Sequence, residues 1–181
     1  MMDSEKIILK RNVSAFLIPS GDKVTLQKGE PVSITQALGG SYTLMLNGNL
    51  FKLDGDDVDA IGKKTIQTIV NPSATLKKEV SEQQVWDQLR TVYDPEIPIN
   101  IVDLGLIYDC KLTKLKEGTK VNVQMTLTAP GCGMGPVIIA EAKQKVQGIP
   151  GIVDIDIELV WEPLWNREMM SETALLQLGI L

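Results

Sequence analysis

The chain has 181 residues, of which 44% are hydrophobic, so it is long enough for one ordinary domain or two small ones and can bury a sizeable core. Its formal net charge is −5, and its Lys and Arg residues form no cluster on one predicted face, which argues against nucleic acid as a partner. With two cysteines and no histidine, it lacks the usual general base, the commonest metal ligand and a disulfide framework.

The first residues carry no basic stretch followed by a long apolar run. No other segment approaches the roughly 20 apolar residues that cross a membrane. We therefore expect a cytoplasmic protein without a membrane partner. In such a reducing compartment the two cysteines are free thiols or metal ligands.

Turn-forming residues divide residues 13–53 into short runs rich in β-branched and apolar side chains, which is typical of a small all-β module. The clearest turn is Asn47-Gly48, which predicts a type I′ hairpin between residues 42–46 and 50–53. The acidic stretch 54–59 lacks the ligand spacing of a calcium loop, so we interpret it as a solvated turn.

A polar segment without hydrophobic pattern begins at Asn71 and marks the expected domain boundary. This division gives a small β-rich domain over residues 1–72 and a domain of mixed α and β character over residues 73–181. The second domain opens with a helix whose N-cap is Ser81 and whose capping-box partner is Gln84. We expect that helix to run until Pro95. Its apolar stripe consists of Val85, Leu89 and Val92.

Three segments then alternate apolar and polar residues with the period of half-buried strands. Their apolar positions are Tyr108, Cys110 and Leu112 in the first segment, every second residue from Val121 to Leu127 in the second, and every second residue from Val153 to Leu159 in the third. A turn at residues 116–119 makes the first two antiparallel. A helix over about 136–147 makes the second and third parallel through a right-handed crossover. With a short last helix over 171–178, the fold is α+β, in the order α-β-β-α-β-α, with a three-stranded mixed sheet packed by helices.

The predicted hairpin brings acidic side chains toward a glycine-rich loop. In an antiparallel pair the segment before Ile107 should approach the segment after Leu127. Asp94, Glu96 and Asp103 would then lie near the loop that carries Cys132. Three carboxylates and one thiol would thus converge from separate parts of the chain.

The loop reads TAPGCGMGP over residues 128–136 and places Cys132 just before a helix. Free N–H groups and the positive end of the helix dipole stabilise a thiolate there, whereas nearby carboxylates act in the opposite sense. Gly131, Gly133 and Gly135 leave the sulfur accessible to a bulky ligand. In the alternative reading, Cys132 merely fills a tight turn and the glycines serve its geometry. Cys110 alternates with core positions and is expected to be a buried, unreactive thiol.

The missing histidine argues against a cysteine hydrolase, which normally needs an adjacent base. A closed zinc site and an iron-sulfur cluster both call for about four ligands, which two separated cysteines of one chain do not provide. Two chains that meet at Cys132 could share a labile cluster, with small thiols or carboxylates completing its coordination.

Several blocks of the sequence resemble the SufT family, a bacterial branch of the metal-sulfur cluster biosynthesis family that includes PaaD-like proteins. The blocks are VYDPEIPINIVDLGLIYDC, MTLTAPGCGMG and VDIDIELVWEPLW, and the resemblance spans about residues 80–170. Residues 18–45 also look like the amino-terminal extension of SufT. One departure is the loop, where Ala129 and Gly133 replace a second threonine and a proline of the broader family's pattern. Any role that rests on that second hydroxyl is therefore in doubt.

The resemblance implies a non-catalytic role in iron-sulfur protein maturation as a carrier, scaffold or targeting factor. It implies a site at Asp94, Glu96, Thr128 and Cys132. Its cargo would be iron or a labile iron-sulfur cluster shared in a homodimer, and its partners would be the assembly machinery and client apoproteins. An adaptor that binds clients without touching iron, and a thiol-based enzyme, are the alternatives.

Overall fold

The computed structural model describes residues 5–64 and 79–180, and the chain divides into two compact units. The described part of the first unit is residues 5–64 together with residues 95–98, and that of the second is residues 79–94 and 99–180. The boundary expected at residue 72 lies outside the described residues.

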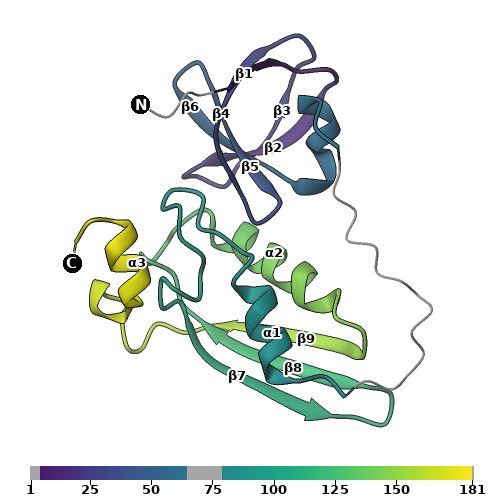
Figure 1. Ribbon diagram of the computed structural model, residues 1–181, viewed down its shortest axis with the longest axis vertical. Coiled ribbons are helices and arrows are strands. Elements are labelled where there is room, and N and C mark those ends of the chain that lie inside the picture. Colours follow the sequence, from purple (N-terminus) through teal and green to yellow (C-terminus); the bar gives the residue numbers. More distant parts are fainter. Residues whose placement is uncertain (1–4, 65–78, 181) are drawn as a thin grey trace. The chain divides into compact units, whose positions relative to one another are not determined.

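The first unit is a six-stranded antiparallel sheet, as its turn-rich sequence predicted (Figure 1). The strands are β1 (Glu5–Ile8), β2 (Val13–Ile18), β3 (Lys23–Leu26), β4 (Pro31–Leu38), β5 (Ser41–Leu46) and β6 (Asn49–Leu53), arranged in the order β1-β4-β5-β6-β2-β3. The Asn47-Gly48 turn has φ angles of 51° and 81°, which confirms the type I′ hairpin between β5 and β6. The fully buried core includes Leu44 and Leu53.

The acidic stretch after β6 is not the solvated turn that the sequence suggested. It forms the 3-10 helix η1 (Gly55–Ile61), with Asp54 as its N-cap. Asp57 and Asp59 both accept hydrogen bonds from the Arg11 guanidinium. The cap at Asp54, the buried side chains of Val58 and Ile61, and the ion pairs with Arg11 together order this element.

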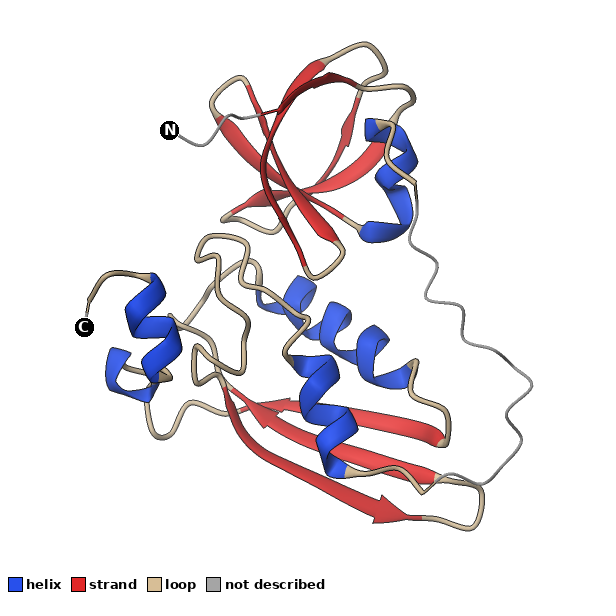
Figure 2. Ribbon diagram, viewed as in Figure 1, coloured by secondary structure: helices blue, strands red, loops and turns tan. Residues whose placement is uncertain are grey.

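The second unit contains a three-stranded mixed sheet whose helices α1 and α2 cover one face (Figure 2). Its elements are α1 (Glu82–Leu89), β7 (Ile107–Lys114), β8 (Thr119–Met125), α2 (Gly135–Gln147), β9 (Ile152–Leu159), η2 (Arg167–Met169) and α3 (Glu172–Gln177). Strand β8 lies in the centre, antiparallel to β7 and parallel to β9. This confirms the predicted α-β-β-α-β-α order and the crossover through α2. No helix of the described residues is long and apolar enough to cross a membrane.

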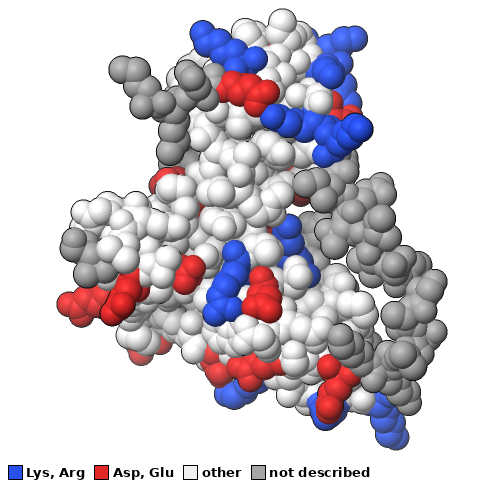
Figure 3. All heavy atoms as spheres, viewed as in Figure 1, with Lys and Arg blue, Asp and Glu red and all other residues white. Residues whose placement is uncertain are grey.

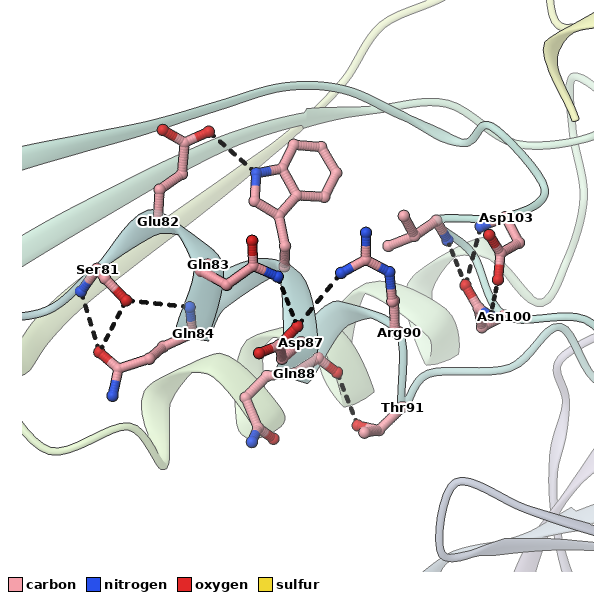
Figure 4. Close-up of polar contacts among 12 residues, drawn as sticks. Ser81, Glu82, Gln83, Gln84, Asp87, Gln88, Arg90, Thr91, Asn100 and Asp103 are labelled. Atoms are coloured by element: carbon pink, nitrogen blue, oxygen red, sulfur yellow. Dashed lines mark hydrogen bonds and ion pairs between the residues drawn. The ribbon is translucent and has the colours of Figure 1, made fainter. Parts of the chain in front are cut away.

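Helix α1 begins as predicted but ends earlier. The Ser81 side chain accepts a hydrogen bond from Gln84 N, and the Gln84 side chain accepts one from Ser81 N, which completes the capping box (Figure 4). The helix stops at Leu89, well before Pro95. The Thr91 hydroxyl donates to Gln88 O at 2.7 Å, and Val92 leaves the helix to accept a hydrogen bond from Ile101 N. Pairing with a later segment therefore ends this helix, and the proline does not.

A β-bulge at the start of β7 breaks the alternation expected there. Ile107 pairs with Met125 and Asp109 pairs with Gln124, so Tyr108 is an extra residue with no partner of its own on β8. Its hydroxyl donates to Pro163 O at 2.7 Å instead. Tyr108 thus does not join Cys110 in the core but holds a segment near the C-terminus.

Candidate functional site

The Asp-Pro-Glu segment forms the tip of a narrow loop between α1 and β7. Tyr93 and Asn100 form an antiparallel bridge, and Asp94 N donates to Ile99 O at 3.1 Å. Asp94 is 6% exposed, whereas Glu96 at the tip is exposed. The two acidic residues of this motif therefore differ in solvent accessibility. Glu96 is accessible from solvent, whereas Asp94 is shielded by the loop.

Asp103 lies in the turn that follows this loop. The Asn100 amide donates to Asp103 Oδ2 at 2.6 Å, and Asn100 Oδ1 accepts from the N–H groups of Val102 and Asp103 (Figure 4). Leu106 N donates to Ile101 O and closes the turn. The carboxylate of Asp103 thus has a structural partner on its own turn.

A hydrogen bond joins this turn to the start of the segment that carries the thiol. Thr126 N donates to Leu106 O at 2.8 Å, which continues the β7–β8 ladder beyond its last strand pair. The segment before Ile107 therefore lies beside the segment after Met125, as the predicted hairpin required.

Cys132 joins two consecutive tight turns before α2. Its N–H donates to Ala129 O at 3.3 Å, and its carbonyl accepts from Gly135 N at 3.1 Å. The helix that follows has Met134 as its N-cap and no side-chain cap. The backbone of Cys132 is used by the turns, while its partly exposed side chain remains available for chemistry.

Two of the three loop glycines have a visible structural reason. Gly131 has a φ of 79°, in the left-handed region that side chains disfavour. A Cβ on Gly135 would lie 2.7 Å from Leu127 Cδ1, so this glycine allows close packing under the loop. Gly133 is not among the positive-φ glycines of the described chain.

Two threonines flank the end of β8, and the sequence drew attention to only one of them. Thr128 is partly exposed at the start of the loop. Thr126 is fully buried, and its hydroxyl has no hydrogen-bond partner. An unpaired buried hydroxyl is uncommon in a folded protein. The only signal for it in the sequence is a polar residue where β8 passes into the loop.

The expected convergence of three carboxylates with the thiol does not form a metal site within the described residues. Within residues 5–64 and 79–180, no three Cys, Asp or Glu side chains are grouped so that they could hold a metal ion. Hairpin pairing indicates which segments are adjacent but not where their side chains meet. Asp103, for example, is engaged with Asn100.

Cys110 lies in the core of the second unit, as its position in the alternating pattern predicted. It is 7% exposed on β7. Burial raises the pKa of its thiol to about 11, with smaller contributions from the negative charges of Glu82 and Asp109. At neutral pH this thiol stays protonated and therefore a poor nucleophile.

Comparison with known proteins places this unit in a family. The profile of the family described as iron-sulfur cluster assembly protein matches residues 82–159. A Porphyromonas gingivalis protein named Fe-S protein maturation auxiliary factor is 48% identical over 101 residues, which are 56% of this chain and 93% of the relative. For the auxiliary factor YitW of Bacillus subtilis the identity is 36% over 103 residues, covering 57% of this chain and 98% of the relative.

A third relative, the auxiliary factor SufT of Staphylococcus aureus, is 46% identical over 89 residues, which are 49% of this chain and 98% of the relative. These three relatives are almost fully matched by about half of this chain, so they have no room for a second unit. They do not support the interpretation of residues 18–45 as an extension typical of SufT. The extent of their match nevertheless shows that the chain belongs to the SufT family of Fe-S protein maturation auxiliary factors.

Proposed function

We propose that this protein matures iron-sulfur proteins without catalytic turnover of a small substrate, and that it acts through the thiolate of Cys132. The observation that carries the proposal is the placement of this thiol. It is partly exposed, lies two residues before Met134, the N-cap of a helix without a side-chain cap, and has its backbone fixed by hydrogen bonds. The printed names of the relatives support the same role.

The cargo would be iron or a labile iron-sulfur cluster, shared between chains. One chain offers one accessible thiol, whereas a cluster prefers four thiolate ligands. A second copy, a partner protein or small thiols would therefore supply the remaining ligands, and incomplete coordination by each chain suits a cargo that must be passed on.

The acidic loop would have a supporting role in this proposal. Exposed Glu96 is the carboxylate that meets a cation or partner directly, while buried Asp94 would hold the loop tip. Thr128 would orient a group bound at Cys132, and Asp103 would stabilise the turn beneath through Asn100. Partners would be the assembly machinery and client apoproteins of the cytoplasm.

An adaptor that binds clients but never carries iron is the second candidate. The printed names of the relatives describe auxiliary factors of maturation, which also suits a protein that binds clients without holding a cluster. Both candidates use the surface around Cys132, but only the carrier needs its sulfur as a metal ligand.

Anaerobic reconstitution with iron and sulfide separates the two candidates. We expect the native protein to gain a cluster absorption band together with stoichiometric iron, and Cys132→Ser to gain neither. Cys110→Ser is the matched control and should reconstitute normally, because its thiol is 7% exposed. Mass in solution should be measured on the same samples, since a shared cluster requires two chains.

The carrier would be refuted if Cys132→Ser bound as much iron and sulfide as the native protein. The adaptor would be refuted if the cluster formed and Cys132→Ser still bound clients but failed to mature them. Complementation of a strain that lacks its own copy provides the maturation readout.

A further inference from the structure

The C-terminal part of the second unit exposes an unusual share of the protein's apolar surface. Nine large hydrophobic side chains are exposed among the described residues, and six of them lie between residues 153 and 180. The most exposed are Leu164 at 63%, Leu176 at 67% and Ile180 at 48%. We call residues 161–180 the C-terminal strap.

The C-terminal strap is an ordered surface fixed to the turn that carries Asp103. Trp165 Nε1 donates to Leu104 O at 2.7 Å, and Ser171 N donates to Asp103 O at 2.8 Å. Because residues 103 and 104 are neighbours, these two hydrogen bonds hold Trp165 and the start of α3 side by side. The Tyr108 hydroxyl, which contacts both Pro163 O and the Met169 sulfur, fixes the middle of the strap.

A glycine permits this close attachment. Gly105 has a φ of 73°, and a Cβ there would lie 2.1 Å from Met169 O. No other residue type fits at this point without moving the backbone of the strap. The exposed apolar side chains are therefore presented by a fixed backbone.

Helix α3 and the residues that end it expose apolar side chains. Ser171 caps the helix through Ala174 N, and Ala174 is fully buried. Glu172 and Leu176, four residues apart, share one face of the helix, and Ile180 follows the helix end. Gly179, with a φ of 66°, allows Ile180 N to donate to Leu175 O, which ends the helix and fixes Ile180.

The C-terminal strap is also acidic. It contains Glu162, Glu168 and Glu172 and one cation, Arg167, which gives it a net charge of −2. Figure 3 shows Asp and Glu side chains along the border of the surface over α3 and no Lys or Arg on the visible face of that helix.

We propose that the C-terminal strap is a docking surface for a basic amphipathic segment of a partner protein. The apolar face of that segment would cover Leu164, Leu176 and Ile180, and its flanking Lys or Arg side chains would meet Glu168 and Glu172. A second copy of this chain fits poorly, because it would bring the same carboxylates into contact. An anionic membrane would be repelled for the same reason. The proposal stands whether or not Cys132 carries iron.

The test uses the full chain and a fluorescent amphipathic peptide of about 14 Leu and Lys residues, long enough for a helix face. Binding is followed by fluorescence anisotropy at low and high salt. We expect the double variant Leu176→Ser/Ile180→Ser to weaken binding by at least about tenfold, because it removes two of the most exposed apolar side chains of the C-terminal strap. Glu168→Gln/Glu172→Gln should weaken it by about threefold at low salt and reduce its salt dependence.

Leu115→Ser is the matched control, since Leu115 is 48% exposed in the same unit but lies in the β7–β8 turn. It should bind the peptide as the native protein does, and all variants should keep the native thermal transition. The proposal fails if Leu115→Ser loses as much affinity as the α3 variant, if a Leu and Glu peptide binds equally well, or if no peptide binds. It also fails if the native chain forms a dimer that the α3 variant dissociates, or if vesicles of phosphatidylcholine bind in place of the peptide.

Discussion

Strand β7 and the loop before α2 each hold one cysteine, and the two regions give the thiol opposite properties. Cys110 is surrounded by the core, and burial raises the pKa of its thiol to about 11. Cys132 is partly exposed between two tight turns, next to a helix N-terminus without a side-chain cap. The residue type is the same, so any difference in reactivity comes from burial and from the surroundings that the fold provides. Four measurements test this comparison.

The largest expected difference is in alkylation. Single-thiol proteins made by Cys110→Ser and by Cys132→Ser isolate each sulfur. At pH 8 in native buffer, we expect iodoacetamide to modify Cys132 at least about 100-fold faster than Cys110, because the reaction needs an accessible thiolate. Mass spectrometry over time gives both rates.

Urea provides the control for this measurement, since unfolding should bring the two rates within about twofold of each other. Equal rates in the native protein would mean that Cys132 is shielded by its loop, and would contradict its proposed role.

Replacement by serine should destabilise one region and spare the other. Cys110→Ser places a hydroxyl in the core and should lower the free energy of unfolding by about 2 kcal/mol. Cys132→Ser should change it by less than about 0.5 kcal/mol, as is usual at partly exposed positions. Urea titrations at pH 7 measure both. A larger loss at Cys132 than at Cys110 would show that the loop thiol is a packing residue.

High pH should remove a stabilising contribution of the buried thiol. The folded state raises the pKa of Cys110 from 9.0 to about 11, so it favours the protonated form. This contribution to stability is complete below pH 9 and is lost as the pH rises toward 11. Between pH 8 and 10.5 the native protein should lose about 1.5 kcal/mol more than Cys110→Val does. Identical losses in the two proteins would place the titration at other groups.

The smallest effect concerns the loop backbone. Gly131→Ala meets no atom within 4 Å but keeps a φ of 79°, so it should lower the free energy of unfolding by about 1 kcal/mol. Gly148→Ala is the control, because Gly148 has a φ of −69° and room for ordinary contacts. Equal stability of the two variants would mean that the loop relaxes around residue 131.

Hydrophobic periodicity and capping residues were enough to predict most of the fold. The alternating segments gave the strands of the second unit, and Ser81 with Gln84 gave the start of α1. The early end of α1 and the bulge at Tyr108 were missed because both depend on distant partners, Ile101 and Pro163. No local pattern contains that information.

The candidate site was predictable to the level of segments. Strand pairing predicted that the segment before Ile107 approaches the segment after Leu127. In the structure the pairing passes from strand to loop slightly earlier, where Thr126 N donates a hydrogen bond to Leu106 O. The prediction did not indicate that Asp103 would bond to Asn100, or that Thr126 would be buried without a partner. The alternating pattern predicts side-chain direction within a strand. Beyond the strand end, the direction depends on local turns that this pattern does not describe.

Strand β9 is an edge of its sheet, and open edges can pair with other chains to form aggregates. Its outward row of Asp154, Asp156 and Glu158 sets like charges against each other whenever two copies approach edge to edge. The lowered pKa of Asp154, caused by its ion pair with Lys120, keeps part of that protection in mild acid. We therefore expect these carboxylates to oppose pairing between two β9 edges, and this repulsion to weaken when they are protonated or when salt screens them.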